Sequence, residues 1–147
     1  MEVTVGTSII AVAGLVLIGL LFTLQLVAVV RPRDEWTIDN VYGGRPDATD
    51  PTAYFAFNQS LAWADVFLWA PLQVAGSVGM LLGERWGFLI ALMASVPFWY
   101  SAVPLYVWDR DLGFRKRTVT YWVSWAVWPV FGVVEGVYCI SRLLDVS

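Results

Sequence analysis

The residues from Val5 to Val30 form an apolar run that carries no charged side chain. At a rise of about 1.5 Å per residue, a helix of this length crosses the hydrocarbon core of a bilayer, which is about 30 Å thick. The chain as a whole is also apolar: 59% of its residues are hydrophobic and 14% are charged, whereas soluble domains have about 45 to 50% and about 25%. The sequence therefore predicts an integral membrane protein.

Three more apolar stretches follow the first, separated by polar or tight connections. Only helices and closed barrels satisfy their backbone hydrogen bonds in lipid, and these stretches lack the alternation of barrel strands. We therefore expect an all-α integral membrane protein, a four-transmembrane-helix bundle in a single domain of residues 1–147. The expected helices cover about residues 5–30, 58–82, 88–108 and 121–144. The aromatic-rich segment between the first two is expected to lie at the membrane interface.

The composition excludes several classes of function. A net charge of −3 offers no electrostatic footprint for nucleic acid. The chain has no histidine and a single cysteine, Cys139, which excludes an internal disulfide and metal sites built on imidazole or paired thiolates. We therefore expect no metal and no cofactor.

Two carboxyl side chains, Asp65 and Glu135, fall inside the expected helices. A charged group within a bilayer costs roughly 3 kcal/mol on insertion scales, so each calls for an explanation. Asp65 is followed at helical spacing by Trp69, Gln73 and Gly76, which places a carboxyl, an indole and an amide on one face of the second helix. That face is expected to point into the bundle.

A comparable face on the last helix carries Trp125, Trp128, Gly132 and Glu135. Helices centred in the bilayer place Asp65 nearer to the long connections and Glu135 nearer to the chain termini, which disfavours a continuous ion path through both carboxyls. The residues expected level with Asp65 are Gln25, Tyr100, Ser101 and Trp128, and Gln73 is expected level with Glu135. We predict a polar and aromatic chamber around Asp65 and a smaller polar contact around Glu135.

Each of these residues also has a simpler interpretation. For Glu135, a structural role as a protonated carboxyl bonded to Gln73 or to a backbone carbonyl competes equally with a functional role. Trp69, Trp125 and Trp128 lie too deep for interfacial anchors, and they either wall a cavity or pack between helices. Four prolines favour the cavity, because kinked helices pack less closely; they are Pro71, Pro97, Pro104 and Pro129.

A family resemblance rests on the spacing of several short segments. The second helix carries Asp65-Val66-Phe67-Leu68-Trp69-Ala70-Pro71-Leu72, preceded by Asp50-Pro51. Ser95-Val96, Trp99-Tyr100, Leu105-Tyr106 and Arg110-Asp111-Leu112-Gly113-Phe114 come later. From Asp50 to the end, this arrangement resembles the emopamil-binding and sigma-two receptor superfamily, which shares the four-helix EXPERA domain. The resemblance implies a pocket that opens sideways to lipid and receives sterols or other flat, often cationic, amphiphiles.

The resemblance also implies roles for individual residues. Asp65 matches the acidic group of the second helix, Asp50 the loop aspartate beneath the pocket, and Trp128 the indole of the last helix. Isomerase members of the superfamily move a proton with a histidine and a glutamate of the first helix, where this chain has Thr23 and Gln25. Whether the chain is an enzyme is therefore left open, and no residue is assigned a catalytic role.

The leading hypothesis is a multi-pass membrane protein that binds a sterol-like or other lipophilic, amine-like small molecule in an intrabundle pocket. The expected ligand-binding residues are Asp65, Trp69, Gln73, Tyr100, Ser101, Trp125, Trp128, Asp50, Gln25 and Glu135. The alternatives are a sterol double-bond isomerase-like enzyme and a non-catalytic subunit or chaperone. The expected partners beside the ligand are membrane lipid and either a second copy or another membrane protein. The expected location is the endoplasmic reticulum in a eukaryote and the cytoplasmic membrane in a prokaryote.

Overall fold

The computed structural model describes residues 1–42, 51–103, 106 and 119–145. Every regular element in this part of the chain is a helix, and no strand occurs in it. The elements are α1 (Val5–Val30), α2 (Glu35–Asn40), α3 (Pro51–Ala64), the π-helical segment η1 (Asp65–Trp69), α4 (Ala70–Leu81), α5 (Arg85–Tyr100) and α7 (Val119–Leu144). The expected all-α class is confirmed.

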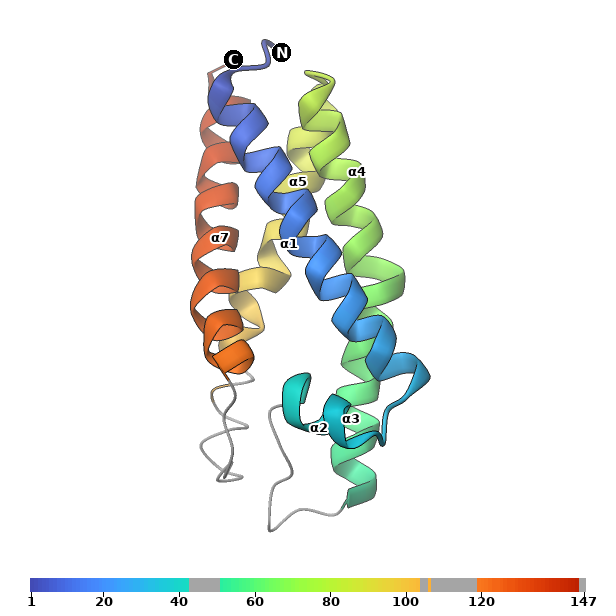
Figure 1. Cartoon of the computed structure of the whole chain (residues 1–147). Coiled ribbons are helices and arrows are strands. Elements are labelled where there is room, and N and C mark those ends of the chain that lie inside the picture. Colours follow the sequence, from blue (N-terminus) through green and yellow to red (C-terminus); the bar gives the residue numbers. More distant parts are fainter. Residues whose placement is uncertain (43–50, 104–105, 107–118, 146–147) are drawn as a thin grey trace.

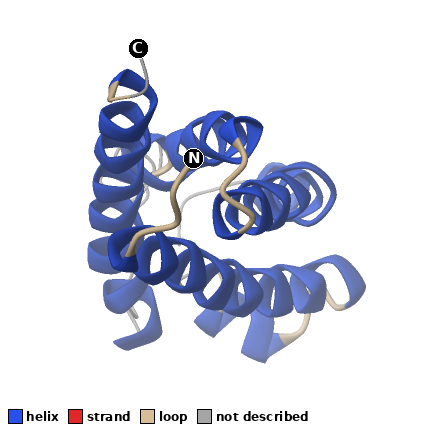
Figure 2. Cartoon of the chain, turned by 90° about the horizontal axis from the view of Figure 1, so that it is seen from above, coloured by secondary structure: helices blue, strands red, loops and turns tan. Residues whose placement is uncertain are grey.

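The long helices lie side by side. α3, η1 and α4 follow one another without interruption as one rod, and α1 crosses this rod obliquely (Figure 1). α1 packs on α4, α4 on α5, and α5 on α7. Seen from the end that holds both termini, the helices form a compact group instead of a flat row (Figure 2). The short helix α2 lies at the opposite end, where Ile38 joins a small core with Ala28 of α1 and Tyr54 of α3.

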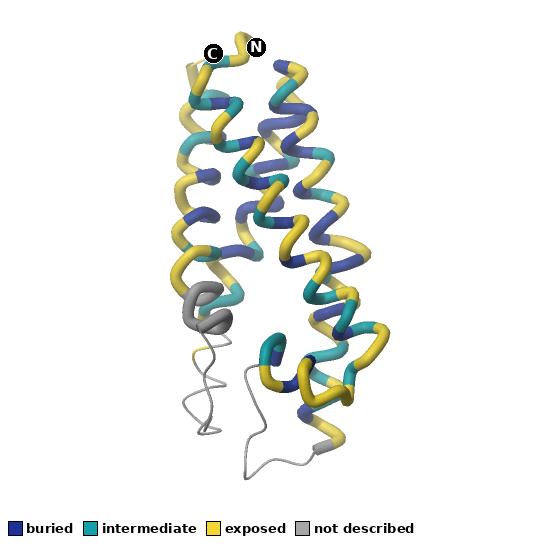
Figure 3. Tube along the Cα trace, in the orientation of Figure 1, coloured by how far each residue is buried: buried dark blue, intermediate teal, exposed yellow. Residues whose placement is uncertain are grey.

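Within the described residues, three helical stretches are long and apolar enough to cross a membrane: Val5–Val30, Thr52–Leu81 and Ala126–Leu144. Exposed residues follow the outer sides of the helices over most of their length (Figure 3). The large apolar side chains among them include Val16, Leu20, Phe67, Val130 and Val137. Apolar surface of this extent is expected where lipid surrounds the helices. The chain is therefore a helical membrane protein.

The helix bounds differ from the expected ones mainly at the starts. α1 has the expected limits, and α7 ends at Leu144 as expected but begins at Val119. The second long helix begins at Pro51 instead of residue 58, because proline is well suited to the first helical position, where no intrahelical partner is needed for its backbone nitrogen. α5 begins at Arg85 instead of residue 88, and its expected end at residue 108 lies outside the described residues. The helix α2 was not expected.

Glycine allows α4 and α5 to approach closely. A β-carbon on Gly87 would lie 2.2 Å from the carbonyl carbon of Gly79, and one on Gly76 would lie 2.6 Å from the backbone nitrogen of Ala91. Small residues at such crossings let backbones touch, which is a common basis of helix association in membranes. The turn between the two helices uses Gly83, whose positive φ of 71° favours glycine.

Hydrogen bonds join the first and last helices near the termini. The hydroxyl of Tyr138 lies 2.7 Å from Oγ1 of Thr7 and 3.0 Å from Oγ1 of Thr4. Thr4 also caps α1, since its side chain accepts a hydrogen bond from the backbone N–H of Thr7. Nη2 of Arg142 donates to the backbone oxygen of Glu2 at 2.6 Å. Polar contacts thus join α7 to the start of α1 and to the residues just before it.

Replacing Tyr138 with phenylalanine is expected to lower the free energy of unfolding by about 1 kcal/mol, because the ring remains while both threonine hydroxyls lose a partner. Thermal unfolding of the purified protein in detergent measures the change. Tyr100→Phe is the matched control, since the hydroxyl of Tyr100 makes no hydrogen bond within the described part of the chain and its side chain is exposed. Equal effects of the two substitutions would contradict the prediction.

Candidate functional site

A fully buried polar pair lies between α4 and α7. Nε2 of Gln73 donates to Oε1 of Glu135 at 2.6 Å and to Oγ of Ser77 at 3.3 Å. All three side chains are 0% exposed. Because hydrogen-bonded polar groups are the rule in protein interiors, this contact explains how two of the most polar side chains of the spans are accommodated. It confirms the expectation that Glu135 lies level with Gln73.

Helix α1 makes room for this pair with a glycine. A β-carbon on Gly14 would lie 2.6 Å from Nε2 of Gln73, 3.0 Å from Oγ of Ser77 and 3.4 Å from Oε1 of Glu135. Any larger residue would push into the hydrogen-bonded atoms. The polar pair is therefore enclosed from the side of α1 by backbone, and Gly14 is a residue of this site that the sequence pattern does not predict.

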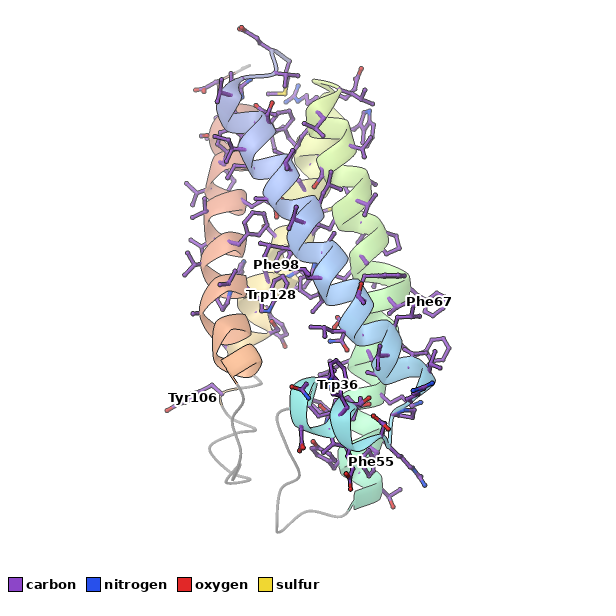
Figure 4. All side chains as sticks on the ribbon, in the orientation of Figure 1. Trp36, Phe55, Phe67, Phe98, Tyr106 and Trp128 are labelled. Carbon is purple, nitrogen blue, oxygen red and sulfur yellow. The ribbon has the colours of Figure 1, made fainter. Side chains whose placement is uncertain are left out.

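An aromatic layer lies beside the polar pair. Nε1 of Trp69 donates to the backbone oxygen of Ala94 at 2.8 Å, and its ring meets Phe98 edge to face with centroids 4.5 Å apart. Trp128 also stacks on Phe98, with centroids 5.7 Å apart (Figure 4). Phe131 completes the cluster at 5.3 Å from Phe98. Trp69 and Trp128 thus both contact Phe98, a residue that the sequence pattern does not predict for this site.

Asp65 begins the π-helical segment. The backbone N–H of Ala70 bonds to the carbonyl of Asp65 instead of to that of the residue four positions back. Pro71 follows and has no N–H to offer to the carbonyl of Phe67. The sequence signal for this irregular turn was therefore the proline, although proline alone does not distinguish a π turn from a kink. Single π turns inside α-helices frequently mark functional sites.

The Asp65 side chain is half-buried and makes no hydrogen bond or ion pair within the described part of the chain. It lies in the stretch Thr52–Leu81, which is apolar enough to cross a membrane. An ionisable residue at such a place generally faces other protein groups or an aqueous cavity and takes part in function. Asp65 therefore differs from Glu135, whose carboxyl already has a partner.

The other residues expected near Asp65 are placed as follows. Gln25 is half-buried on α1, and Ser101 is half-buried with its hydroxyl donating to the backbone oxygen of Phe98 at 3.3 Å. Tyr100 is 61% exposed. Asp50 and the side chain of Trp125 lie outside the described residues. A common chamber of these residues with Asp65 stays a prediction.

Both carboxyls lie within apolar helical stretches, and only Glu135 has a hydrogen-bond partner among the described residues. The described residues contain no group of three or more histidine, cysteine, aspartate or glutamate side chains that could hold a metal ion. Cys139 is buried in a core cluster with Ala11 of α1 and Met80 of α4. Binding of a cation, of a hydrogen-bonding ligand or of a proton remains as the chemistry that this arrangement favours.

Comparison with known proteins adds one similarity. The chain is 31% identical over 99 residues to oligopeptide transporter 1 of Arabidopsis thaliana. The alignment covers 58% of this chain and 12% of the transporter, so this chain spans only a small part of the length of that protein. No family model matches the chain, and no solved structure matches it. The similarity to a membrane transporter agrees with the membrane-spanning helices.

Proposed function

We propose that α1, the rod of α3, η1 and α4, α5 and α7 all cross the membrane as a four-helix bundle with an interior site for a lipophilic cation. The observation that carries the proposal is the half-buried carboxyl of Asp65, which has no partner within the described residues and lies inside a stretch able to span a membrane. A carboxylate in that position is costly unless a positive group compensates it.

The aromatic layer supplies the second part of such a site. Trp69 lies one helical turn from Asp65. Phe98 contacts both Trp69 and Trp128, so the three rings form one layer. An ammonium near an indole gains cation–π energy of about 2 kcal/mol when it is desolvated. A flat amphiphile with an amine would therefore place its charge at Asp65 and its apolar body against the aromatic layer. Half-burial of Trp128 leaves part of its ring available for this contact.

The resemblance to the emopamil-binding and sigma-two receptor superfamily supports a sterol-like ligand within this proposal. We place binding above double-bond isomerisation, because that reaction requires one group to deliver a proton and another to remove one. Near the level of Asp65, the first helix is expected to offer only Thr23 and Gln25 for the second role, and Glu135 is engaged with Gln73.

Asp65→Asn is expected to weaken binding of a sterol that carries a side-chain amine by about 1.5 to 3 kcal/mol, the range for a hydrogen bond to a charged group. This corresponds to about 10- to 150-fold in Kd. The measurement is titration of the protein in lipid nanodiscs, followed by tryptophan fluorescence. Binding of cholesterol, which has no amine, should change little.

Asp39→Asn is the matched control, because Asp39 is an exposed aspartate on α2. It should leave the affinity for both sterols unchanged. Equal affinity of Asp65→Asn and the unchanged protein for the amine would refute the role of Asp65. Failure of the amine-bearing sterol to bind the unchanged protein would refute the interior site.

A further inference from the structure

The hydrogen bonds of the buried pair leave two acceptors without a donor. Both hydrogens of the Gln73 amide are used, one by Oε1 of Glu135 and one by Oγ of Ser77. The atoms left over are Oε1 of Gln73 and Oε2 of Glu135, each buried and without a hydrogen-bond partner. If Glu135 were ionised, both would be acceptors, and neither could satisfy the other.

No cation among the described residues compensates a charge on Glu135. Arg142, two turns further along α7, donates to the backbone oxygen of Glu2 and lies with its guanidinium 5.9 Å from the centroid of the Phe88 ring. A carboxylate without a counter-ion in an apolar interior is strongly disfavoured. The arrangement therefore lacks both the donor and the charge that an ionised Glu135 requires.

We propose that Gln73 and Glu135 form a binding site for one exchangeable proton within the membrane-spanning helices. The proton resides on Oε2 of Glu135 and is donated to Oε1 of Gln73, so that acid and amide are joined by two antiparallel hydrogen bonds. All polar atoms of the pair are then satisfied. This site is distinct from Asp65, which lies two turns earlier on the same rod, with Trp69 between them.

The other titratable groups near this site have different surroundings or different hydrogen-bond partners. On α7, Cys139 is one turn away in an apolar cluster, and Tyr138 is bonded to the threonines of α1. α1 and α4 carry no titratable side chain, and on α5 the only ones are Arg85 and Tyr100 at its two ends. Within the described residues, Gln73 is the side chain that hydrogen-bonds to Glu135, and its Oε1 is a buried acceptor without a donor, so we place the proton between these two side chains.

Proton release at this site would act on the contact between α4 and α7. These two helices are not neighbours in the packing order, since each packs on α5, and the bond from Gln73 to Glu135 links them directly. Loss of the proton removes one of the two hydrogen bonds and leaves a charge in the interior. The link between α4 and α7 therefore holds while the proton is bound and weakens when it leaves.

Infrared spectroscopy of the protein in nanodiscs tests the site. At neutral pH the unchanged protein should show the carbonyl stretch of a protonated carboxylic acid, and the band should shift in heavy water, because the proton exchanges. The test is made in the Asp65→Asn background, so that Asp65 cannot contribute a second protonated carboxyl. In that background Glu135→Gln should remove the band, whereas Glu84→Gln should not, because Glu84 is an exposed glutamate before α5. A band that is absent from Asp65→Asn, or that survives the addition of Glu135→Gln, would overturn the proposal.

Thermal unfolding between about pH 5 and about pH 9, above the ordinary range of carboxyl groups, gives a second readout. A glutamine at position 135 offers the same donor and acceptor as the protonated acid but cannot ionise. The unchanged protein should lose thermal stability as the pH rises, since proton release breaks the link, and Glu135→Gln should lose less. An identical dependence on pH in both proteins would contradict the proposal, whatever the Asp65 site binds.

Discussion

Replacing Gly87 with alanine is expected to lower the free energy of unfolding by about 3 kcal/mol, the upper part of the usual range for overpacking. The added β-carbon would lie 2.2 Å from the carbonyl carbon of Gly79 and 2.4 Å from the backbone nitrogen of Met80. Both obstacles are backbone atoms of α4, so no side-chain rotation can relieve the clash. α4 and α5 would have to separate, which disrupts the closest approach between them. Chemical or thermal unfolding in detergent measures the loss.

Gly19→Ala is the matched control for this substitution. Gly19 also lies within a helix, but nothing is found within 4 Å of the position that its β-carbon would take. Alanine is there expected to stabilise the helix by up to about 1 kcal/mol, because glycine has the lower helix propensity. A destabilisation of Gly87→Ala no larger than that of Gly19→Ala would show that the approach of α4 and α5 is not tight.

Gln73→Leu is expected to destabilise the protein by about 2 to 3 kcal/mol. The substitution keeps a side chain of similar size but removes the donor to Glu135, so that a buried carboxyl loses its hydrogen-bond partner. An unsatisfied buried polar group costs about 1 to 3 kcal/mol, and more when it is charged. The free energy of unfolding, measured for the purified protein, should fall accordingly.

The double variant Gln73→Leu with Glu135→Leu separates this effect from a loss of packing. Replacement of both partners by apolar groups of similar shape is often nearly neutral. The double variant should therefore be more stable than Gln73→Leu alone, and the coupling energy between the two positions should exceed about 0.5 kcal/mol. Additive effects of the two single substitutions would mean that the hydrogen bond contributes nothing to stability.

The sequence predicted the helices well where apolar residues alone determine them. The limits of α1 coincide with its apolar run, because in a membrane this helix is surrounded by other helices and lipid. The start of the second long helix was misjudged because Pro51 was grouped with the turn-forming residues before it, whereas α3 begins there and its Tyr54 joins Ile38 of α2 in the small core. α2 itself is a single short amphipathic element, in which Thr37 and Ile38 are buried, and a pattern of that length cannot be distinguished from a turn in sequence.

The level of a site residue along its helix could be predicted from the sequence. Its neighbours on other helices could not, because they depend on how the helices pack. Counting turns placed Gln73 level with Glu135, and the 2.6 Å hydrogen bond confirms it. The same counting could not reveal that Phe98 would lie between Trp69 and Trp128, because that contact depends on the rotation of α5 about its axis. The room that Gly14 leaves for the polar pair depends likewise on how near α1 comes to α4.

The π-helical segment Asp65–Trp69 has a consequence for the orientation of the rod that contains it. Each residue of an α-helix advances by about 100° around the axis, so a wider turn offsets all later side chains from the earlier ones. In α3, Tyr54 and Ala62 face the small core at α2, whereas in α4 Gln73 and Met80 face the interior between the long helices. The wider turn sets the phase between these two faces. Removal of one residue from it would rotate one half of the rod against the other, so the number of residues in η1 matters here as much as their identity.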